Sequence, residues 1–328
     1  MRVAVIGAGS MGGMHAQLLG GIEGVDEVLV VDANTDRAAA VAQVVGGRSC
    51  THEEALAAAD AVVVATPPEL HAASVLAALE RGTSVLCEKP LTESLATTLA
   101  LTDAIEARGA HVEIGFQRRH DAGFVAARDA ISGRLHLVHL IAFDPLVPPS
   151  DPASRPMHEA APMFRDSSVH DFDFVRWVSG QEVVDVSVAA SRRDALTVDD
   201  PRGIESAVVT MRLDGGALAV LEASWLHPSG YDIRIELLSE GAAVTAGLSP
   251  RTPARHLDWP LDAEPGWSGY LDRFEGAYRA ELVAFLAAAR GESPPASSAR
   301  DGLQAMRIAV AATRSFSEGR TVRLDEVP

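Results

Sequence analysis

The 328-residue sequence contains only two cysteines, Cys50 and Cys87, and their spacing is not that of a zinc site or a disulfide framework. Basic side chains are also scarce: 28 lysines and arginines stand against 45 acidic residues, which gives a formal net charge of -17. Such a charge repels nucleic-acid phosphates and anionic membrane surfaces. Aromatic residues, at 5%, offer few rings for stacking on bases. We therefore expect neither a nucleic-acid partner nor a bound metal.

Long apolar segments are missing as well. The run at 57–65 is interrupted by Asp60 and is far shorter than the ~20 residues that span a bilayer. The sequence starts directly on an apolar run at 3–6, without a basic and apolar leader. With two unpaired cysteines, these features predict a cytoplasmic protein with no membrane partner.

The first third of the chain has an alternating pattern. Apolar runs of strand length alternate with segments of helical spacing, and the runs lie at 3–6, 27–32, 61–65, 84–88 and 112–116. Helices are expected at 14–19, 37–45, 70–81 and 95–108. Strands that alternate with helices predict an α/β domain, here a doubly wound parallel sheet of the Rossmann type over residues 1–119.

The pattern changes after Arg119. One helix is expected at 121–132, followed by strands at 135–143, 182–190, 204–212, 217–225, 232–239 and 242–248, with turn residues between several of them. Helices at 270–290 and 299–317 close the chain. Residues 120–328 are thus predicted to form an α+β domain with a large, predominantly antiparallel sheet. The segment 145–163 contains six prolines and is predicted to be a long loop.

A glycine-rich loop follows the first predicted strand and opens the first helix. It reads Gly7-Ala8-Gly9-Ser10-Met11-Gly12 and matches the pattern that binds the pyrophosphate of a dinucleotide. Asp32 ends the next strand about 20 positions after the last glycine, where a carboxylate accepts hydrogen bonds from the adenosine ribose. Its charge repels the extra phosphate of NADP, so the sequence predicts NAD. The alternative is an aspartate that only caps a turn.

The end of the third predicted strand is a second candidate for the cofactor site. Ala65, Thr66 and Pro67 lie at the carboxyl edge, where open α/β sheets bind ligands. His71 lies in the first turn of the next helix. A structural role and a contact with the nicotinamide half of the cofactor are equally compatible with that position.

Five ordered motifs resemble the glucose-fructose oxidoreductase and inositol dehydrogenase (Gfo/Idh/MocA) family. They are the glycine loop, Ala65-Thr66-Pro67, Glu88-Lys89-Pro90, the segment Gly115-Phe116-Gln117-Arg118-Arg119 and the segment 166–173, which begins Asp166-Ser167-Ser168-Val169-His170. The resemblance covers nearly the whole chain and is strongest to inositol 2-dehydrogenase-like members. It implies an NAD-dependent oxidoreductase that acts on a ring alcohol of a cyclic polyol or sugar, with inositol the leading substrate.

The resemblance also implies roles for individual residues. Lys89, Asp166 and His170 correspond to the catalytic group, with His170 as the general base and Glu88 and Lys89 beside the cofactor. The chemistry agrees, because oxidation of an alcohol needs a hydride acceptor and a base for the hydroxyl proton. If 166–178 is one helix, Asp166 and His170 project from the same face. The alternative for this pair is a carboxylate at a helix start and a structural histidine.

Substrate contacts are expected from Lys89, Asp166, His170 and four further residues. Gln117 and Arg118 follow the fifth strand, Asp144 ends the first strand of the second domain, and Tyr231 stands at the start of another strand. A tyrosine in a strand is as often a core residue. Arg119 is expected in an ion pair, and Asp171 and Asp173 as solvated or structural residues.

Several alternatives to an inositol dehydrogenase remain on the sequence alone. The same scaffold can oxidise another sugar, an amino sugar or a diol, because a fold does not fix its substrate. A non-catalytic NAD-binding regulator is a further possibility, although the presence of Lys89, Asp166 and His170 argues against it. The stretch 152–163 departs from the glycine-rich segment of many relatives, which weakens the assignment of myo-inositol itself. The resemblance implies a homo-oligomer, a tetramer or dimer formed through the outer face of the second-domain sheet.

Overall fold

The computed structural model describes residues 1–145, 163–192, 204–249 and 266–328. These residues form two compact units: residues 1–117 with 276–304, and residues 118–275 with 305–328. The stretch 276–304 therefore groups with the amino-terminal unit, although it is distant in sequence. Most of the predicted proline-rich loop, residues 146–162, lies outside the described residues.

The first unit contains a six-stranded sheet in the order β3-β2-β1-β4-β5-β6, in which every strand pair is parallel. Its strands are β1 (Arg2–Ile6), β2 (Glu27–Val31), β3 (Arg48–Ser49), β4 (Ala61–Val64), β5 (Ser84–Cys87) and β6 (Val112–Ile114), and its helices include α1 (Ser10–Leu19), α2 (Thr35–Val45), α3 (His52–Ala58), α4 (Pro68–Leu79) and α5 (Leu95–Arg108). The predicted doubly wound sheet is confirmed. The strand order reverses between β1 and β4, which is where such sheets bind ligands.

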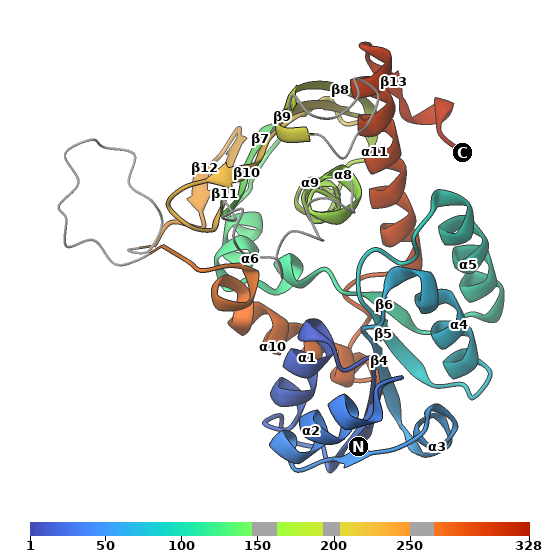
Figure 1. The fold of residues 1–328 in the computed structure, drawn as a ribbon. Coiled ribbons are helices and arrows are strands. Elements are labelled where there is room, and N and C mark those ends of the chain that lie inside the picture. Colours follow the sequence, from blue (N-terminus) through green and yellow to red (C-terminus); the bar gives the residue numbers. More distant parts are fainter. Residues whose placement is uncertain (146–162, 193–203, 250–265) are drawn as a thin grey trace. The chain divides into compact units, whose positions relative to one another are not determined.

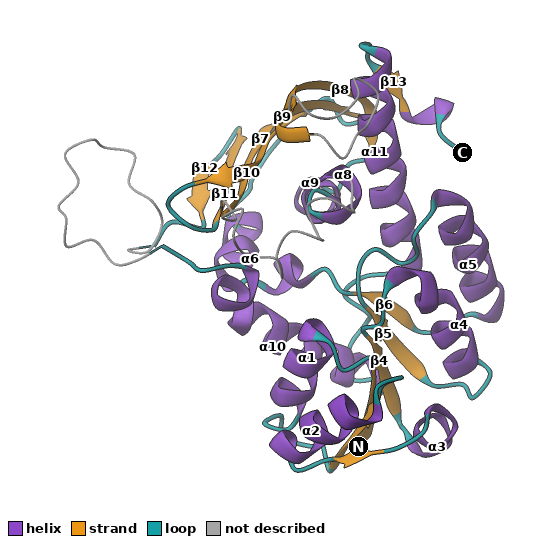
Figure 2. Ribbon diagram, viewed as in Figure 1, coloured by secondary structure: helices purple, strands orange, loops and turns teal. Residues whose placement is uncertain are grey.

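Helices cover both faces of this parallel sheet, as Figure 2 shows. On one face α1, α2 and α10 (Tyr270–Ala289) share a core with β1, β2 and β4, to which α10 contributes Leu282, Phe285 and Leu286. On the other face lie α3, α4 and α5. Strands buried on both sides must be apolar throughout, and β4 (Ala61–Val64) is fully buried. This explains why its sequence is a continuous apolar run.

Two elements of the first unit are absent from the sequence expectations. Helix α3 has only seven residues and was not predicted, although Thr51 and Glu54 form a complete capping box at its start. Strand β3 has only two residues, both exposed. Short elements carry too few residues for a periodic pattern to emerge.

The second unit contains a seven-stranded sheet in the order β12-β11-β7-β10-β9-β8-β13. Its elements are α6 (Ala122–Asp129), β7 (Leu135–Pro145), α8 (Met163–Asp166), α9 (Val169–Ser179), β8 (Val183–Arg192), β9 (Ile204–Leu213), β10 (Leu218–His227), β11 (Asp232–Ser239), β12 (Ala243–Ala246), β13 (Val322–Arg323) and η3 (Leu324–Glu326). Two further elements, η1 (Gln117–His120) and α11 (Ala299–Glu318), begin in the first unit and continue into the second. Among the strand pairs formed by the described residues of this sheet, only β10 with β7 is parallel. The predicted, predominantly antiparallel sheet is confirmed.

The two faces of this second sheet differ. On β10, Ala219, Leu221, Ala223 and Trp225 alternate with more exposed residues and are buried. Helix α9 packs against β7 (Figure 1). The other face presents exposed apolar side chains, among them Val208, Leu218 and Leu238. Within the described part of the chain, no helix has the length and apolar character needed to cross a membrane.

The turn between β1 and α1 depends on close backbone contacts. Gly7 has a φ of 98°, and a Cβ there would lie 2.5 Å from the carbonyl oxygen of Ala65 at the end of β4. A Cβ on Gly12 would lie 1.7 Å from the carbonyl oxygen of Gly7. A Cβ on Gly9, in contrast, would meet no atom within 4 Å. Gly7 and Gly12 are therefore required by the fold itself, whereas Gly9 is not.

Helix α10 places an acidic side chain inside the first unit. Glu281 is 2% exposed, and neither of its carboxylate oxygens has a hydrogen-bond partner among the described residues. Burial raises the pKa of Glu281 well above its ordinary value of 4.5, and the nearby carboxylates of Glu88 and Glu113 raise it further. The folded protein therefore holds a proton on Glu281 at pH values where the unfolded chain has released it.

The glycine contacts give a prediction about stability. Gly12→Ala forces a Cβ against a backbone oxygen, so we expect a loss of about 3 kcal/mol in the free energy of unfolding, or failure to fold. Gly9→Ala is the matched control, and its melting temperature without ligand should stay close to that of the wild type. Thermal denaturation followed by circular dichroism measures both. Equal melting temperatures for the two variants would contradict the close contact.

The buried proton on Glu281 gives a second prediction. As pH rises above about 4.5, the unfolded chain loses this proton before the folded protein does, so the wild type loses stability as pH increases toward the folded pKa. Glu281→Gln cannot titrate. Its melting temperature relative to the wild type should therefore increase as the pH is raised from 5. The exposed Glu23→Gln is the control, and parallel curves for Glu281→Gln and wild type would contradict the prediction.

Candidate active site

The glycine loop leads into the start of helix α1 at the switch point of the parallel sheet. Helix α1 begins at Ser10, and Gly9 caps it without a side-chain hydrogen bond. The backbone N–H groups of the first turn, including that of Met11, are therefore directed to whatever lies before the helix. The open space at Gly9 permits close approach of a pyrophosphate. These residues fit the predicted dinucleotide.

Asp32 is held rigidly beside this loop. Its side chain is 5% exposed and accepts the N–H groups of Ala8 at 2.7 Å and Asn34 at 2.8 Å. Arg37 adds two bonds, from Nε at 3.1 Å and Nη2 at 2.6 Å. Burial raises the pKa of Asp32, but the Arg37 guanidinium and the two backbone donors outweigh it, so the net shift is downward. The carboxylate thus stays ionised.

His71 lies at the carboxyl edge but bonds to the protein backbone. It is 1% exposed, with Nδ1 3.0 Å from the carbonyl oxygen of Pro90 and Nε2 2.8 Å from that of Thr66. The ring therefore connects the loop after β4, which contains Thr66 and Pro67, to the loop after β5. These contacts favour the structural alternative for His71, while Ala65 and Thr66 lie against the glycine loop through Gly7.

Glu88 and Lys89 follow β5 directly. The carboxylate of Glu88, a 6% exposed residue, accepts the backbone N–H of Lys89 on Oε2 at 3.2 Å, and its Oε1 lies 2.7 Å from Nε2 of the fully buried His15. The Lys89-Pro90 peptide is cis. Gln117 lies after β6, is 2% exposed, and its Oε1 has no hydrogen-bond partner within the described residues. A buried acceptor of this kind favours a contact with a hydroxyl ligand.

The structure corrects the expected helix over 166–178. Helix α8 ends at Asp166 and α9 begins at Val169, so Asp166 and His170 lie on two helices. The N–H groups of Ser167 and Ser168 both bond to the carbonyl oxygen of Met163 at 3.0 Å, which closes the first helix. The argument from four-residue spacing on one helix was therefore wrong, although the two side chains remain neighbours in sequence around a tight turn.

A buried polar cluster surrounds Arg118 in the second unit. Its guanidinium Nη1 donates to Oδ1 of Asp171, and the phenol of Tyr231 contacts it. Burial raises the pKa of Asp171, and Arg118 opposes that shift. Burial also raises the pKa of Tyr231, and the carboxylate of Asp144 adds to the increase. Tyr231 therefore remains a hydrogen-bond donor, and the structure brings together three of the predicted substrate contacts: Arg118, Asp144 and Tyr231.

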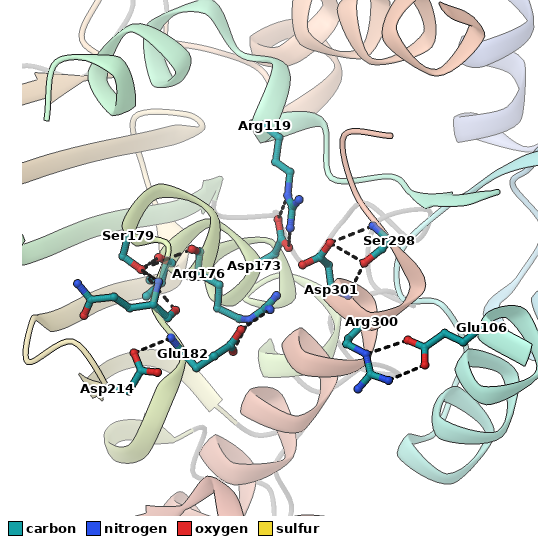
Figure 3. Close-up of polar contacts among 12 residues, drawn as sticks. Glu106, Arg119, Asp173, Arg176, Ser179, Glu182, Asp214, Ser298, Arg300 and Asp301 are labelled. Atoms are coloured by element: carbon teal, nitrogen blue, oxygen red, sulfur yellow. Dashed lines mark hydrogen bonds and ion pairs between the residues drawn. The ribbon is translucent and has the colours of Figure 1, made fainter. Parts of the chain in front are cut away.

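Arg119 makes the ion pair expected for it. Its Nε and Nη2 donate to Asp173 at 2.8 and 2.5 Å (Figure 3). Asp171 and Asp173 are each 1% exposed. Of the two expected roles, solvated or structural, the structure therefore supports the structural one. Sequence reasoning did not predict that Arg118 is paired too. The pairing order follows the chain, with Arg118 on Asp171 and Arg119 on Asp173.

Two further residues were missed by sequence reasoning. Arg37 binds Asp32 but follows it by five positions, at the start of the next helix. His15 lies on the buried face of α1 with Gly12, Ala16 and Leu19. A histidine on an apolar helix face is the sequence signal for the second of these. In the described part of the chain, no group of three or more His, Cys, Asp or Glu side chains is arranged to hold a metal ion.

Comparison with known proteins identifies an oxidoreductase family over nearly the whole chain. A family model described as an oxidoreductase family with an NAD-binding Rossmann fold matches residues 1–116, and the model of its C-terminal alpha/beta domain matches residues 130–324. Myo-inositol dehydrogenase Hyg17 of Streptomyces leeuwenhoekii is 35% identical, covering 97% of this chain and 98% of its own. Inositol 2-dehydrogenase of Rhizobium meliloti is 31% identical and covers 99% of both.

A solved structure agrees in its fold. The crystal structure of a myo-inositol dehydrogenase from Corynebacterium glutamicum superimposes with a TM-score of 0.86 at 27% identity, covering 99% of this chain and 98% of that one. The matched family model with an NAD-binding Rossmann fold includes the glycine loop and Asp32. The chain therefore belongs to the Gfo/Idh/MocA family of NAD-binding oxidoreductases.

Proposed function

We propose that this protein is an NAD-dependent inositol dehydrogenase that oxidises a secondary alcohol of the ring to a ketone. The observation that carries this proposal is the set of full-length relatives named as inositol dehydrogenases, on a chain that contains Lys89, Asp166 and His170. The polar cluster of Arg118, Asp144 and Tyr231 supports it, because a cyclic polyol presents many hydroxyls to donors and acceptors.

Lys89, His170 and Asp166 have different roles in the transfer of the hydroxyl proton. NAD, when bound, supplies the hydride acceptor at C4 of its nicotinamide. Lys89 donates a hydrogen bond to the substrate oxygen and stabilises the developing negative charge. His170 takes the hydroxyl proton on an imidazole nitrogen as the carbonyl forms. Asp166 binds a neighbouring hydroxyl and favours the protonated imidazole electrostatically. One hydride and one proton thus leave the alcohol.

The remaining predicted residues bind rather than react. Gly7, Gly9, Ser10, Met11 and Gly12 hold the pyrophosphate, and Asp32 holds the ribose. Ala65, Thr66 and Pro67 line the cofactor site together with the backbone of Glu88. His71 holds that loop in place through its contact with the carbonyl oxygen of Thr66. Gln117, Arg118, Asp144 and Tyr231 contact substrate hydroxyls. Residues 1–119 then serve as the cofactor domain, to which the stretch 276–304 is added, and the remainder of residues 120–328 as the substrate and assembly domain, in a cytoplasmic enzyme.

A different substrate is the main alternative. The family scaffold accommodates other sugars, amino sugars and diols, and the stretch 152–163, which departs from many relatives, lies outside the described residues. A panel assay separates these possibilities. Purified protein with NAD and a series of inositols, aldoses, amino sugars and diols should form NADH fastest with an inositol. Preference for another class would move the assignment there. Stabilisation by NAD without turnover on any compound would indicate a regulator.

The catalytic assignment predicts the effect of removing the lysine. Lys89→Ala should lower kcat by about 100-fold or more, because the transition state loses its charge-assisted hydrogen bond. Stopped-flow or steady-state formation of NADH measures this effect. Arg108→Ala, at the end of α5, is the control for loss of a positive charge and should retain full activity. A normal kcat for Lys89→Ala, with only a higher KM, would show that the lysine binds substrate and does not take part in the reaction.

We also propose that the protein is a homotetramer assembled through the outer face of the seven-stranded sheet. A shallow groove of about 570 Å³ lies on this face, lined mainly by small and apolar residues of β7, β8, β9 and β10. Exposed apolar side chains continue across the sheet, with Val208 at 45%, Leu218 at 51% and Leu238 at 45%. A soluble monomer rarely leaves such a surface uncovered, which supports burial against a second copy.

The assembly proposal is tested by placing a charge in this face. Val208 pairs with Glu222 on the neighbouring strand, so a lysine at position 208 gains an ion partner and leaves the sheet intact. Val208→Lys should shift the protein to a smaller species in analytical ultracentrifugation. Val44→Lys, on the 71% exposed position of α2, is the control and should sediment like the wild type. An unchanged mass for Val208→Lys would place the interface elsewhere.

A further inference from the structure

A buried contact connects the helix that follows the glycine loop to the strand end that carries Lys89. His15 lies on the inner face of α1, three residues after Gly12, and is fully buried. Its Nε2 is 2.7 Å from Oε1 of Glu88. The other oxygen of Glu88, Oε2, accepts the backbone N–H of Lys89 at 3.2 Å. One carboxylate thus spans the distance between the first helix and Lys89.

The hydrogen-bond geometry fixes what each group does. A backbone N–H can only donate, so Oε2 of Glu88 is an acceptor. If Oε1 accepts as well, Nε2 of His15 must carry the proton that lies between them. The carboxylate is then held by one donor on each oxygen. Such charge-assisted bonds, in a site shielded from water, are stronger than their exposed counterparts.

The surroundings leave Glu88 little freedom to move. A Cβ on Gly115, at the end of β6, would lie 3.0 Å from Oε2 and 3.1 Å from Cδ of Glu88, so the carboxylate rests directly on the backbone of that glycine. The ring of Tyr278, on α10, packs edge-on against His15 with 6.0 Å between ring centres. Glu281 follows one helical turn later, and the charge of Glu88 contributes to the raised pKa of that residue.

We propose that His15 and Glu88 are positioning residues that lock the backbone of Lys89 to the pyrophosphate-binding helix, so that the lysine is held in a fixed place relative to the bound cofactor. This inference rests on the proposed role of Lys89. Reaction rates depend steeply on placement, and an error of about 1 Å can cost about 100-fold. Neither residue needs to touch the substrate to affect the rate.

A second His–Glu pair in the same unit provides a matched control. His111 binds Glu113 through Nε2 and Oε1 at 2.8 Å, and Glu113 also accepts a backbone N–H, that of Ala296, at 3.0 Å. Both pairs thus join an imidazole and a buried carboxylate that also holds a backbone amide. Only the pair of His15 and Glu88 holds the amide of Lys89. Substitution of His111 therefore measures how much stability the protein loses when a buried His–Glu pair is removed.

The experiment compares His15→Leu, His15→Gln and His111→Leu with the wild type. His15→Leu should lower kcat by about tenfold or more, while the Kd for NAD, measured by fluorescence titration, stays within about twofold. Both His15→Leu and His111→Leu should lower the melting temperature, by similar amounts, but His111→Leu should leave kcat unchanged. His15→Gln keeps an N–H donor close to the position of Nε2 and should restore kcat to within about threefold of the wild type. A lower melting temperature for His15→Leu with normal kcat would overturn the proposal, as would failure of His15→Gln to restore the rate.

A variant that leaves both partners in place covers the case in which His15→Leu does not fold. Gly115→Ala places a methyl group against the carboxylate of Glu88 and should lower kcat with little change in the Kd for NAD. Full activity in Gly115→Ala would count against the positioning role. The result for Lys89→Ala separates the two proposals. If that variant is inactive while His15→Leu and Gly115→Ala are fully active, only the positioning role is wrong. If Lys89→Ala is active, the catalytic assignment itself fails.

Discussion

The contact between the backbones of Gly7 and Gly12 is the constraint on which the cofactor site depends. A side chain at Gly12 would overlap the carbonyl oxygen of Gly7, so the chain can turn from β1 into α1 this tightly only with glycine there. The tight turn directs the first N–H groups of α1 at the carboxyl edge of the sheet, at the point where the order of strands reverses. It also presses Gly7 against Ala65, which fixes the end of β4 beside the loop. Helix start, strand end and switch point therefore coincide.

Buried charges organise the rest of the site, and each is hydrogen-bonded to a partner. Asp32 is bound by two backbone N–H groups and Arg37, and Glu88 lies between His15 and the amide of Lys89. Arg118 and Asp171 form a comparable pair in the second unit. Burying a charge costs free energy unless it is paired and hydrogen-bonded. Paired in this way, such groups favour a single arrangement of the functional side chains.

The sequence predicted much of the fold because the dominant patterns are local. Continuous apolar runs such as that of β4 indicate strands covered on both faces, and the glycine loop with Asp32 indicates the first crossover of a Rossmann sheet. Helix α3 escaped prediction because its seven residues cannot show a period. The break between α8 and α9 escaped because a helical spacing of Asp166 and His170 does not reveal that Ser167 and Ser168 turn the chain between them.

The candidate site was predicted less completely, since its partners are distant in sequence. His15 and Glu88 are separated by 73 positions, and Arg118 and Asp171 by 53, so no local pattern indicates that they meet. By itself the sequence determined the class of fold, the dinucleotide loop and the residue types available for proton transfer, because these depend on short-range backbone geometry and on side-chain chemistry. Only the tertiary structure decided which charges are paired, which histidine nitrogens face carbonyl oxygens and which glycines are required, because those outcomes depend on packing between segments that the chain brings together from afar.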